Sequence, residues 1–336
     1  MIKNTKNTNI PKYKPPVHDF EIEYDVEFDE SNMDFENLKE LTEDESLRYY
    51  DHKHYRIDSH SKYKKISVDL SNHDEIEEAN VLKYAHTLNL QYCNKITNVS
   101  MLGSVYKLNL SFCYNICDVS ALHSVYDLDL SECNSVPFIG CLINVKHLKI
   151  NYLTGFTDTT LPNNLITLSC VGCKRISTVN NLKQIEKLNV KYCRIKTVND
   201  LEKLHTLNVS CCEELKNVKN LPSLIKLNAG GCKKLITINN LKIVKELILE
   251  KCKKIKSIDS CANVSNLNMC DCPNIKDIGN LRNLRVLRID GYVDGVHLLK
   301  NLDMLQININ CSIKMKRRLK KLKKINPNVC FKYFNY

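Results

Sequence analysis

Apolar residues recur along most of the chain with a period of twenty residues. Each repeat opens on a short stretch in which a leucine and the residue two places later are apolar, the alternation expected of a strand with one buried face. Intervals between the opening leucines are twenty residues in nine cases and nineteen in one. The opening leucines are Leu88, Leu108, Leu128, Leu148, Leu168, Leu188, Leu207, Leu227, Leu247, Leu267 and Leu287.

Seven apolar positions repeat in each unit. In the unit around Leu207, for example, these positions are Leu204, Leu207, Val209, Cys212, Leu215, Val218 and Leu221. Ordering twenty residues costs about 30 kcal/mol at ~1.5 kcal/mol each, so no unit folds alone. Stacking buries each unit between two neighbours and lets their strands pair. The pattern therefore predicts a solenoid, with a partial first copy at Val68 and Leu70 and a degenerate last one at Leu305 and Ile307.

The stretches LNLSFC, from Leu108, and LDLSEC, from Leu128, resemble the leucine-rich repeat family over roughly residues 66 to 310. The cysteines are similar to the variety common in F-box proteins, and the short period to the bacterial type. Composition and tandem regularity are similar to leucine-rich repeat proteins of giant DNA viruses. The resemblance implies an α/β-type solenoid: a right-handed arc with a parallel β-sheet on the concave face and mostly extended or 3₁₀ convex segments.

Acidic and basic residues are segregated along the chain. Residues 19 to 45 hold 13 acidic residues and one lysine, whereas residues 46 to 336 hold 44 Lys and Arg against 25 Asp and Glu. We expect an acidic, flexible segment at 1–32, an N-terminal cap at 33–65, the solenoid at 66–310 and a basic C-terminal cap at 311–336. The alternating DFEIEYDVEFDE is either a disordered tail, an added strand over the first coil, or a partner-binding motif.

Both caps carry helical spacing. Phe35, Leu38 and Leu41 predict a short helix in the N-terminal cap, and Ile313, Leu319 and Leu322 predict a capping helix at the other end. Eight basic residues lie between Lys314 and Lys324. They form a solvated helix face, a nuclear-import patch or a phosphate-binding surface.

Cysteine recurs five residues after the opening leucine in nine repeats. No secretory signal or membrane span is visible, which predicts an intracellular, cytoplasmic protein in which thiols stay reduced; the basic run leaves nuclear entry open. We interpret these cysteines as a buried structural ladder, at the position where the resembling family often has Asn. Its members are Cys93, Cys113, Cys133, Cys173, Cys193, Cys212, Cys232, Cys252 and Cys272.

Other candidate chemistry is sparse. Cys170 and Cys173 form a CxxC, but both occupy core positions and lack the second ligand pair that a structural zinc needs. We therefore predict no metal and no cofactor, and expect Cys211 and Cys270, outside the ladder, to be the reactive thiols. His52, His54 and His60 suit a solvated cap or a weak metal site. Without phosphate loop, HExxH or nucleophile elbow, we predict that the chain is not an enzyme.

Binding is the remaining class of function. The concave column between the two apolar strand positions is rich in asparagine and carries Asn89, Asn109, Asp129 and Lys149 in its first four coils. It is either a partner surface or a self-bonded amide ladder. At the strand ends, Tyr92, Phe112, Tyr152 and Tyr192 share one repeat position, and Tyr106 and Tyr126 precede two strands. They either bind a partner or pack on one another along the turns.

We thus predict a monomeric, non-catalytic scaffold that binds another protein through the concave face and the strand-end aromatics. A binder of nucleic acid or anionic surfaces, acting through the basic body and C-terminal helix, is the alternative. A ubiquitin-ligase substrate receptor is a third, although the Leu-Pro start of an F-box is absent.

Overall fold

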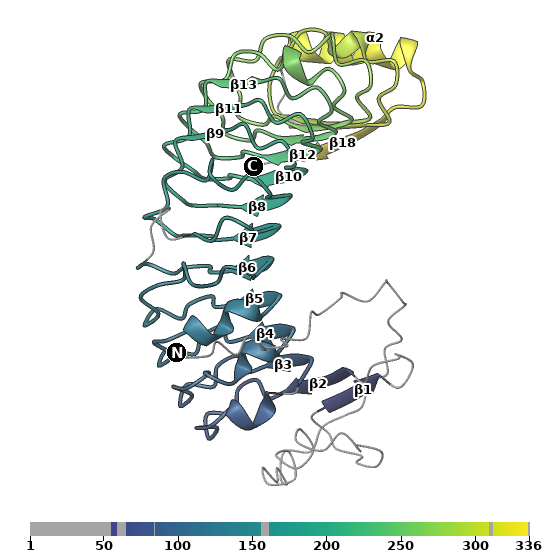
Figure 1. Cartoon of the computed structure of the whole chain (residues 1–336). Coiled ribbons are helices and arrows are strands. Elements are labelled where there is room, and N and C mark those ends of the chain that lie inside the picture. Colours follow the sequence, from purple (N-terminus) through teal and green to yellow (C-terminus); the bar gives the residue numbers. More distant parts are fainter. Residues whose placement is uncertain (1–54, 59–64, 84, 156–160, 309–311, 335–336) are drawn as a thin grey trace, which may run out of the picture.

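The chain folds into a parallel β-solenoid of about twelve turns, here called coils, which curves into an arc (Figure 1). This computed structural model describes the backbone of residues 55–58, 65–83, 85–155, 161–308 and 312–334, and side chains from residue 67 onward. The predicted solenoid, with a parallel β-sheet on the concave face and mostly extended or 3₁₀ convex segments, is confirmed. Expectations for residues 1–54, including the acidic segment, the helix near Leu38 and the histidines His52 and His54, lie outside the described residues, as does His60.

A fifteen-stranded sheet lines the concave side (Figure 1). Its strands run parallel and in register, Leu88 beside Leu108 and Leu188 beside Leu207, apart from the antiparallel first pair. Their order is β1 (Tyr55–Asp58), β2 (Lys65–Asp69), β3 (Thr87–Asn89), β4 (Lys107–Asn109), β5 (Asp127–Asp129), β6 (His147–Lys149), β7 (Thr167–Ser169), β8 (Lys187–Asn189), β10 (Thr206–Asn208), β12 (Lys226–Asn228), β14 (Glu246–Ile248), β15 (Asn266–Asn268), β16 (Val286–Ile289), β17 (Met304–Asn308) and β18 (Cys330–Phe334).

The core is one continuous apolar column inside the coils. Each three-residue strand points only its middle residue inward, as Leu207 does between Thr206 and Asn208. The seven apolar positions predicted for this coil are at most 1% exposed. Full burial of a leucine contributes about 1.5–3 kcal/mol, and the column offsets the cost of ordering each coil only because its neighbours cover both sides.

The convex side contains short 3₁₀ segments and a second, small sheet. The 3₁₀ segments are η1 (Asn80–Leu82), η2 (Leu102–Ser104), η3 (Ser120–Ser124), η5 (Asp259–Cys261) and η6 (Val296–Leu298). The second sheet joins β9 (Thr197–Asn199), β11 (Asn217–Lys219) and β13 (Thr237–Asn239), again in parallel. Twenty residues cannot hold a strand, two turns and a full α-helix, so the return path stays extended or 3₁₀.

Two coils depart from the period without breaking the sheet. The nineteen-residue interval removes one residue from the turn after Cys193, so that Ile195 rather than a residue three places on is buried. In the coil that begins at Leu148, Leu153 fills the ladder position and Leu161 is also buried. Both changes fall outside the strands, which is why the register survives them.

The C-terminal end is closed by a crossover. Helix α2 (Ile313–Ile325) begins at Ser312, whose hydroxyl accepts the N–H of Met315 at 3.2 Å, and it leads into β18, which pairs parallel with β17. Its buried face consists of Met315, Leu319 and Leu322, whereas Ile313 is 72% exposed. Arg318 fixes the helix to the last coil through Asp294 at 2.9 Å.

Candidate functional site

In eleven successive coils, a residue with left-handed backbone lies three positions after the end of the concave strand. In successive coils these residues are Asn72, Tyr92, Phe112, Glu132, Tyr152, Gly172, Tyr192, Cys211, Gly231, Lys251 and Asp271, with φ between 53° and 78°. The hydrogen bonding of these left-handed residues is similar from coil to coil. For example, the N–H of Tyr92 donates to the carbonyl oxygen of Ser111, in the next coil, at 3.0 Å. This turn directs the following ladder residue inward and the left-handed residue outward.

The nine predicted ladder cysteines lie inside the turns, each at most 5% exposed. Every thiol donates to a carbonyl oxygen of the preceding coil at 2.9–3.0 Å, as Cys113 does to Leu90 and Cys212 to Val190. Burial raises the pKa of Cys93 from its ordinary 9.0 to about 11 and that of Cys113 to about 12. The thiols of Cys93 and Cys113 are therefore protonated donors at neutral pH, as their hydrogen bonds require.

The expectation that Cys270 is one of the reactive thiols was wrong. Cys270 is fully buried, at the repeat position three residues after the opening leucine where Ser111, Ser131 and Ser210 are also buried. Cys211 occupies the left-handed position and is half-exposed. Both cysteines of the CxxC, Cys170 and Cys173, are buried in the core.

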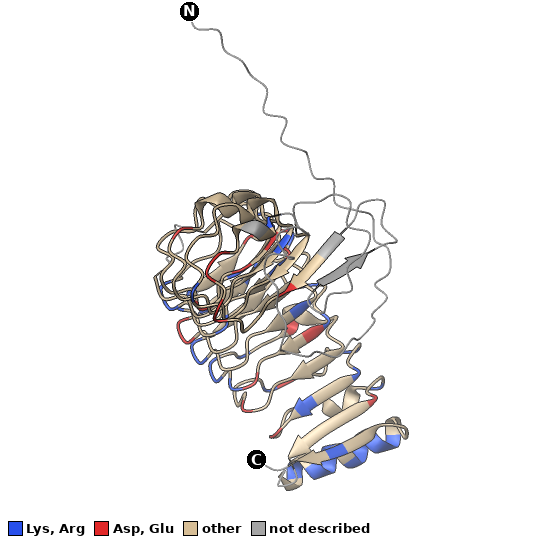
Figure 2. Ribbon diagram, turned by 90° about the horizontal axis from the view of Figure 1, so that it is seen from below, with Lys and Arg blue, Asp and Glu red and all other residues tan. Residues whose placement is uncertain are grey.

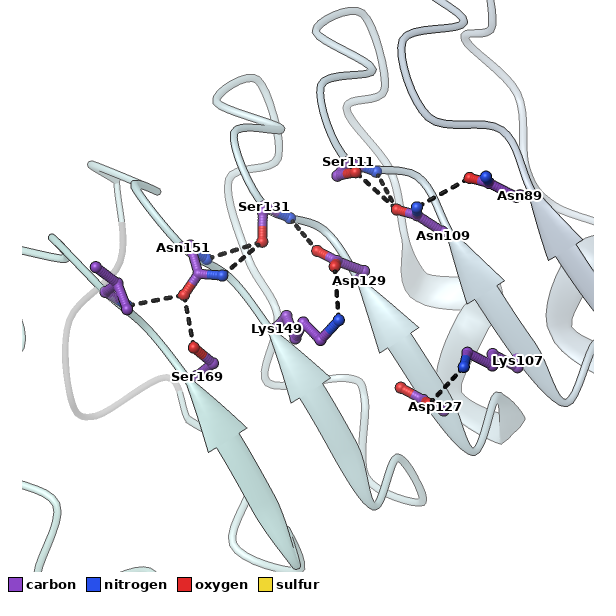
Figure 3. Close-up of polar contacts among 11 residues, drawn as sticks. Asn89, Lys107, Asn109, Ser111, Asp127, Asp129, Ser131, Lys149, Asn151 and Ser169 are labelled. Atoms are coloured by element: carbon purple, nitrogen blue, oxygen red, sulfur yellow. Dashed lines mark hydrogen bonds and ion pairs between the residues drawn. The ribbon is translucent and has the colours of Figure 1, made fainter. Parts of the chain in front are cut away.

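The asparagine column is tied into the strand-end turns. Asn109 Nδ2 donates to Asn89 Oδ1 at 2.9 Å (Figure 3). Asn89 Nδ2 in turn donates to Asp69 at 2.9 Å. The side-chain oxygens then accept backbone N–H groups two residues on, Ser111 on Asn109 at 3.0 Å and Ser131 on Asp129 at 3.0 Å. These contacts favour the self-bonded ladder for Asn89, Asn109 and Asp129.

Two columns of rings border this polar stripe in the N-terminal coils. Before the strands, His86, Tyr106 and Tyr126 stack in series with centroids 4.8 and 4.7 Å apart, and His147 continues the series at 5.0 Å. After the strands, Tyr92 stacks on Phe112 at 4.3 Å, and Tyr114 meets Phe112 edge-on. We call these the leading and trailing ring columns. The repeat pattern pointed to Tyr106 and Tyr126 but not to His86, which shares their repeat register. It also did not point to His147, which lies one residue later in its repeat and is tilted by 58° from the ring of Tyr126.

The other predicted contact residues are more scattered. Glu132 separates Phe112 from Tyr152, whose ring lies against Gly172, where an added Cβ would fall 2.6 Å from the ring. Tyr192 is 48% exposed and carries the ammonium of Lys191 over its ring at 4.8 Å. Lys149 is exposed and reaches Asp129 at 3.3 Å, in the preceding coil (Figure 3).

Metal-binding convergence is not seen in the described part of the chain. Among those residues, no three His, Cys, Asp or Glu side chains gather as a metal ion would require. No helix in the described residues combines the length and apolar character of a bilayer span.

Comparison with known proteins gives structural neighbours only. No protein-family model and no curated protein matches the chain. Among solved structures, it is similar to the functional domain of InlJ from Listeria monocytogenes, which includes a cysteine ladder, at 17% identity over 79% of this chain and 72% of that one, with a TM-score of 0.40. A second similar chain comes from the Rad7–Elc1 complex of yeast, at 15% identity, with coverage of 71% and 78% and a TM-score of 0.37.

Proposed function

We propose that this protein is a non-catalytic, monomeric scaffold that binds another protein across the concave side of its first coils. The observation that carries this proposal is the pair of ring columns on either side of one polar stripe. Both columns lie in the coils from His86 to His147, and Tyr92 and Tyr114 are 37% and 44% exposed. In the equivalent leading position, later coils carry Lys146, Ile166, Glu186, His205, Ile225, Lys245, Ser265 and Arg285, so that the one ring among them, His205, has no ring at this position in either neighbouring coil.

The rings are ordered before any partner arrives. Tyr106 and Tyr126 are stacked with an interplanar angle of 11°, and Tyr92 and Phe112 with one of 16°. Ordering a free side chain at an interface costs about 0.5–1.5 kcal/mol, and a pre-stacked ring avoids much of that cost. Aromatic side chains presented in this way are typical of the few residues that dominate protein–protein affinity.

The stripe between the columns supplies orientation. Its side-chain amides are already hydrogen-bonded within the sheet. They therefore give a partner a rigid polar surface, and few of their donors and acceptors are left for new hydrogen bonds. Lys107 lies 3.9 Å from Asp127 and Lys149 lies 3.3 Å from Asp129, and both lysines are exposed (Figure 3). Rim charges of this kind affect association rate and specificity more than affinity.

The test uses substitutions that the repeat itself tolerates. Tyr106→Ser and Tyr126→Ser place in the leading column the residue found at Ser265, and Tyr92→Asn places in the trailing turn the residue found at Asn72. Proteins captured under reducing conditions from the native cell should be bound at least tenfold more weakly by the triple variant.

The matched control is Ile225→Ser with Lys245→Ser, which alters the same leading position in two later coils. It should retain the partner, and both variants should melt within a few degrees of the parent. An unchanged set of partners for the triple variant, with its fold intact, would contradict the proposal.

A further inference from the structure

Charge is distributed unevenly along the solenoid. Residues 67–173 contain 5 Lys and Arg against 10 Asp and Glu, whereas residues 174–336 contain 33 against 13. Figure 2 shows Lys and Arg recurring at successive turns along one side of the arc and along α2. The proposed protein-binding surface lies in the acidic half, so the basic half calls for a separate explanation.

Eleven basic residues occupy the turns that follow six successive ladder cysteines. We call this set the basic edge, and all its members are exposed. It comprises Lys174, Arg175, Arg194, Lys196, Lys216, Lys233, Lys234, Lys253, Lys254, Lys256 and Lys276.

Backbone contacts align the basic edge from coil to coil. The N–H of Lys216 donates to the carbonyl oxygen of Lys196 at 2.9 Å, and the N–H of Ile236 donates to that of Lys216 at 2.9 Å. Lys233 reaches Glu213 in the preceding coil at 3.3 Å, and Lys234 reaches Glu214 at 2.7 Å. With about 4.8 Å between coils, the edge runs for roughly 24 Å as a line of evenly spaced cations.

The fold does not require these cations. Coils in the N-terminal half have the same strands and inner column, yet their corresponding turns carry Asp74, Glu75 and Glu77 in one coil and Asn94 and Lys95 in the next. Lys233, Lys234 and Lys253 form ion pairs, the last with Asp271 at 3.4 Å. The other eight form no ion pair with any carboxylate among the described residues.

We propose that the basic edge is a binding site for the phosphate backbone of nucleic acid. A line of cations at a regular interval matches a linear polyanion with regularly spaced charges, and each neutralised phosphate releases condensed counterions. Ile236 is the one large apolar side chain at these positions in the six coils, and no aromatic ring lies among them. The edge therefore contacts phosphates without stacking on bases, and binding is independent of sequence.

The test is fluorescence anisotropy with labelled 30-nucleotide DNA, single-stranded and duplex, in increasing NaCl. The edge variant combines Lys174→Asn, Arg175→Ser, Lys254→Ser and Lys256→Thr, which are residues that N-terminal coils carry at these positions. It should bind at least tenfold more weakly in ~0.1 M NaCl, with a salt slope shallower by about 3 to 4, one for each phosphate that the variant no longer neutralises.

The control variant removes the same charge from the acidic half, with Lys95, Lys107, Lys146 and Lys149 each changed to Asn. It should keep the parent's salt slope. Equal weakening by both variants would assign binding to net charge and overturn the proposal. Two other outcomes would also overturn it: an edge variant that binds DNA as the parent does, and a parent that binds vesicles containing anionic lipid but not DNA.

Discussion

The thiol of Cys113 donates to the carbonyl oxygen of Leu90 at 3.0 Å, and the same oxygen accepts the N–H of Cys93 at 3.2 Å. One carbonyl thus serves the turn of its own coil and the ladder residue of the next. This shared acceptor extends coil-to-coil bonding from the strand into the turn. Cysteine suits the position because its side chain is small and its S–H is a weak donor that tolerates burial.

Removing one thiol from the middle of the ladder should destabilise the solenoid without releasing metal. Cys212→Ala leaves the carbonyl of Val190 without its thiol donor and creates a small void, a loss of about 1–2 kcal/mol. Cys212→Ser, which keeps a donor, should lose less. Thermal melting measures the effect, and elemental analysis of the parent should find no stoichiometric zinc; zinc that is lost in Cys212→Ala would refute the structural interpretation.

Thiol labelling should separate two classes of cysteine in the native protein. Cys117 and Cys330 are exposed, and Cys211 is half-exposed, so a maleimide at neutral pH should modify them first. Cys270 and the ladder cysteines should react only after unfolding. Mass spectrometry of digested samples, labelled with and without denaturant, locates the modified residues. Rapid native labelling of Cys270 would show that its coil opens.

Alkaline pH should lower the melting temperature through the ladder. Burial raises the pKa of Cys212 and of Cys232 from 9.0 to about 12, so the folded state holds these protons more tightly than the unfolded state. This contribution is fully present below about pH 9 and is lost as the pH rises toward 12. At pH 10 the loss is on the order of 1 kcal/mol per thiol. Melting at pH 8 and pH 10 measures it, and Cys212→Ser, with one thiol fewer, should show a smaller decrease.

Opposite substitutions at the left-handed turn should have opposite effects. Gly172 has φ +74° and lies against the ring of Tyr152, so Gly172→Ala should destabilise by about 1–3 kcal/mol. Glu132 holds φ 64° with a side chain, so Glu132→Gly should be neutral or stabilising. Chemical denaturation compares the two, and a destabilising Glu132→Gly would mean that the glutamate side chain contributes more than the strain costs.

The core could be predicted because the buried residues themselves recur at fixed intervals in the sequence. Leu207, Val209 and Cys212 recur at the same offsets in coil after coil, and the strands follow from that alternation. The left-handed turn was missed because Tyr92 and Phe112 ordinarily avoid that conformation, although Gly172, Gly231 and Asn72 at the same position were a usable signal. The second sheet was missed because β9, β11 and β13 bury an apolar repeat position, at Val198, Val218 and Ile238, that the other coils also bury without forming a strand there.

Surface features were harder to predict than the core because they depend on differences between repeats. Cys270 resembled an outward-facing strand residue until its burial was known. The ring contacts of His86 and His147 with the leading ring column became visible only in the structure, where neighbouring coils lie side by side. The basic edge was hidden because charge was summed over the whole body, which averages an acidic half with a basic one.

The shortened coil after Cys193 shows how tolerant this architecture is of change in length. Strand register continues from Leu188 to Leu207 although the interval between them is one residue shorter, because the turn absorbs the difference. Since a coil contacts only its two neighbours, a whole coil can be duplicated or deleted without a change in the structure of the others. Ring-bearing and cation-bearing coils are therefore separable units of inheritance, and a lineage can lengthen either part of the array while the other keeps its surface.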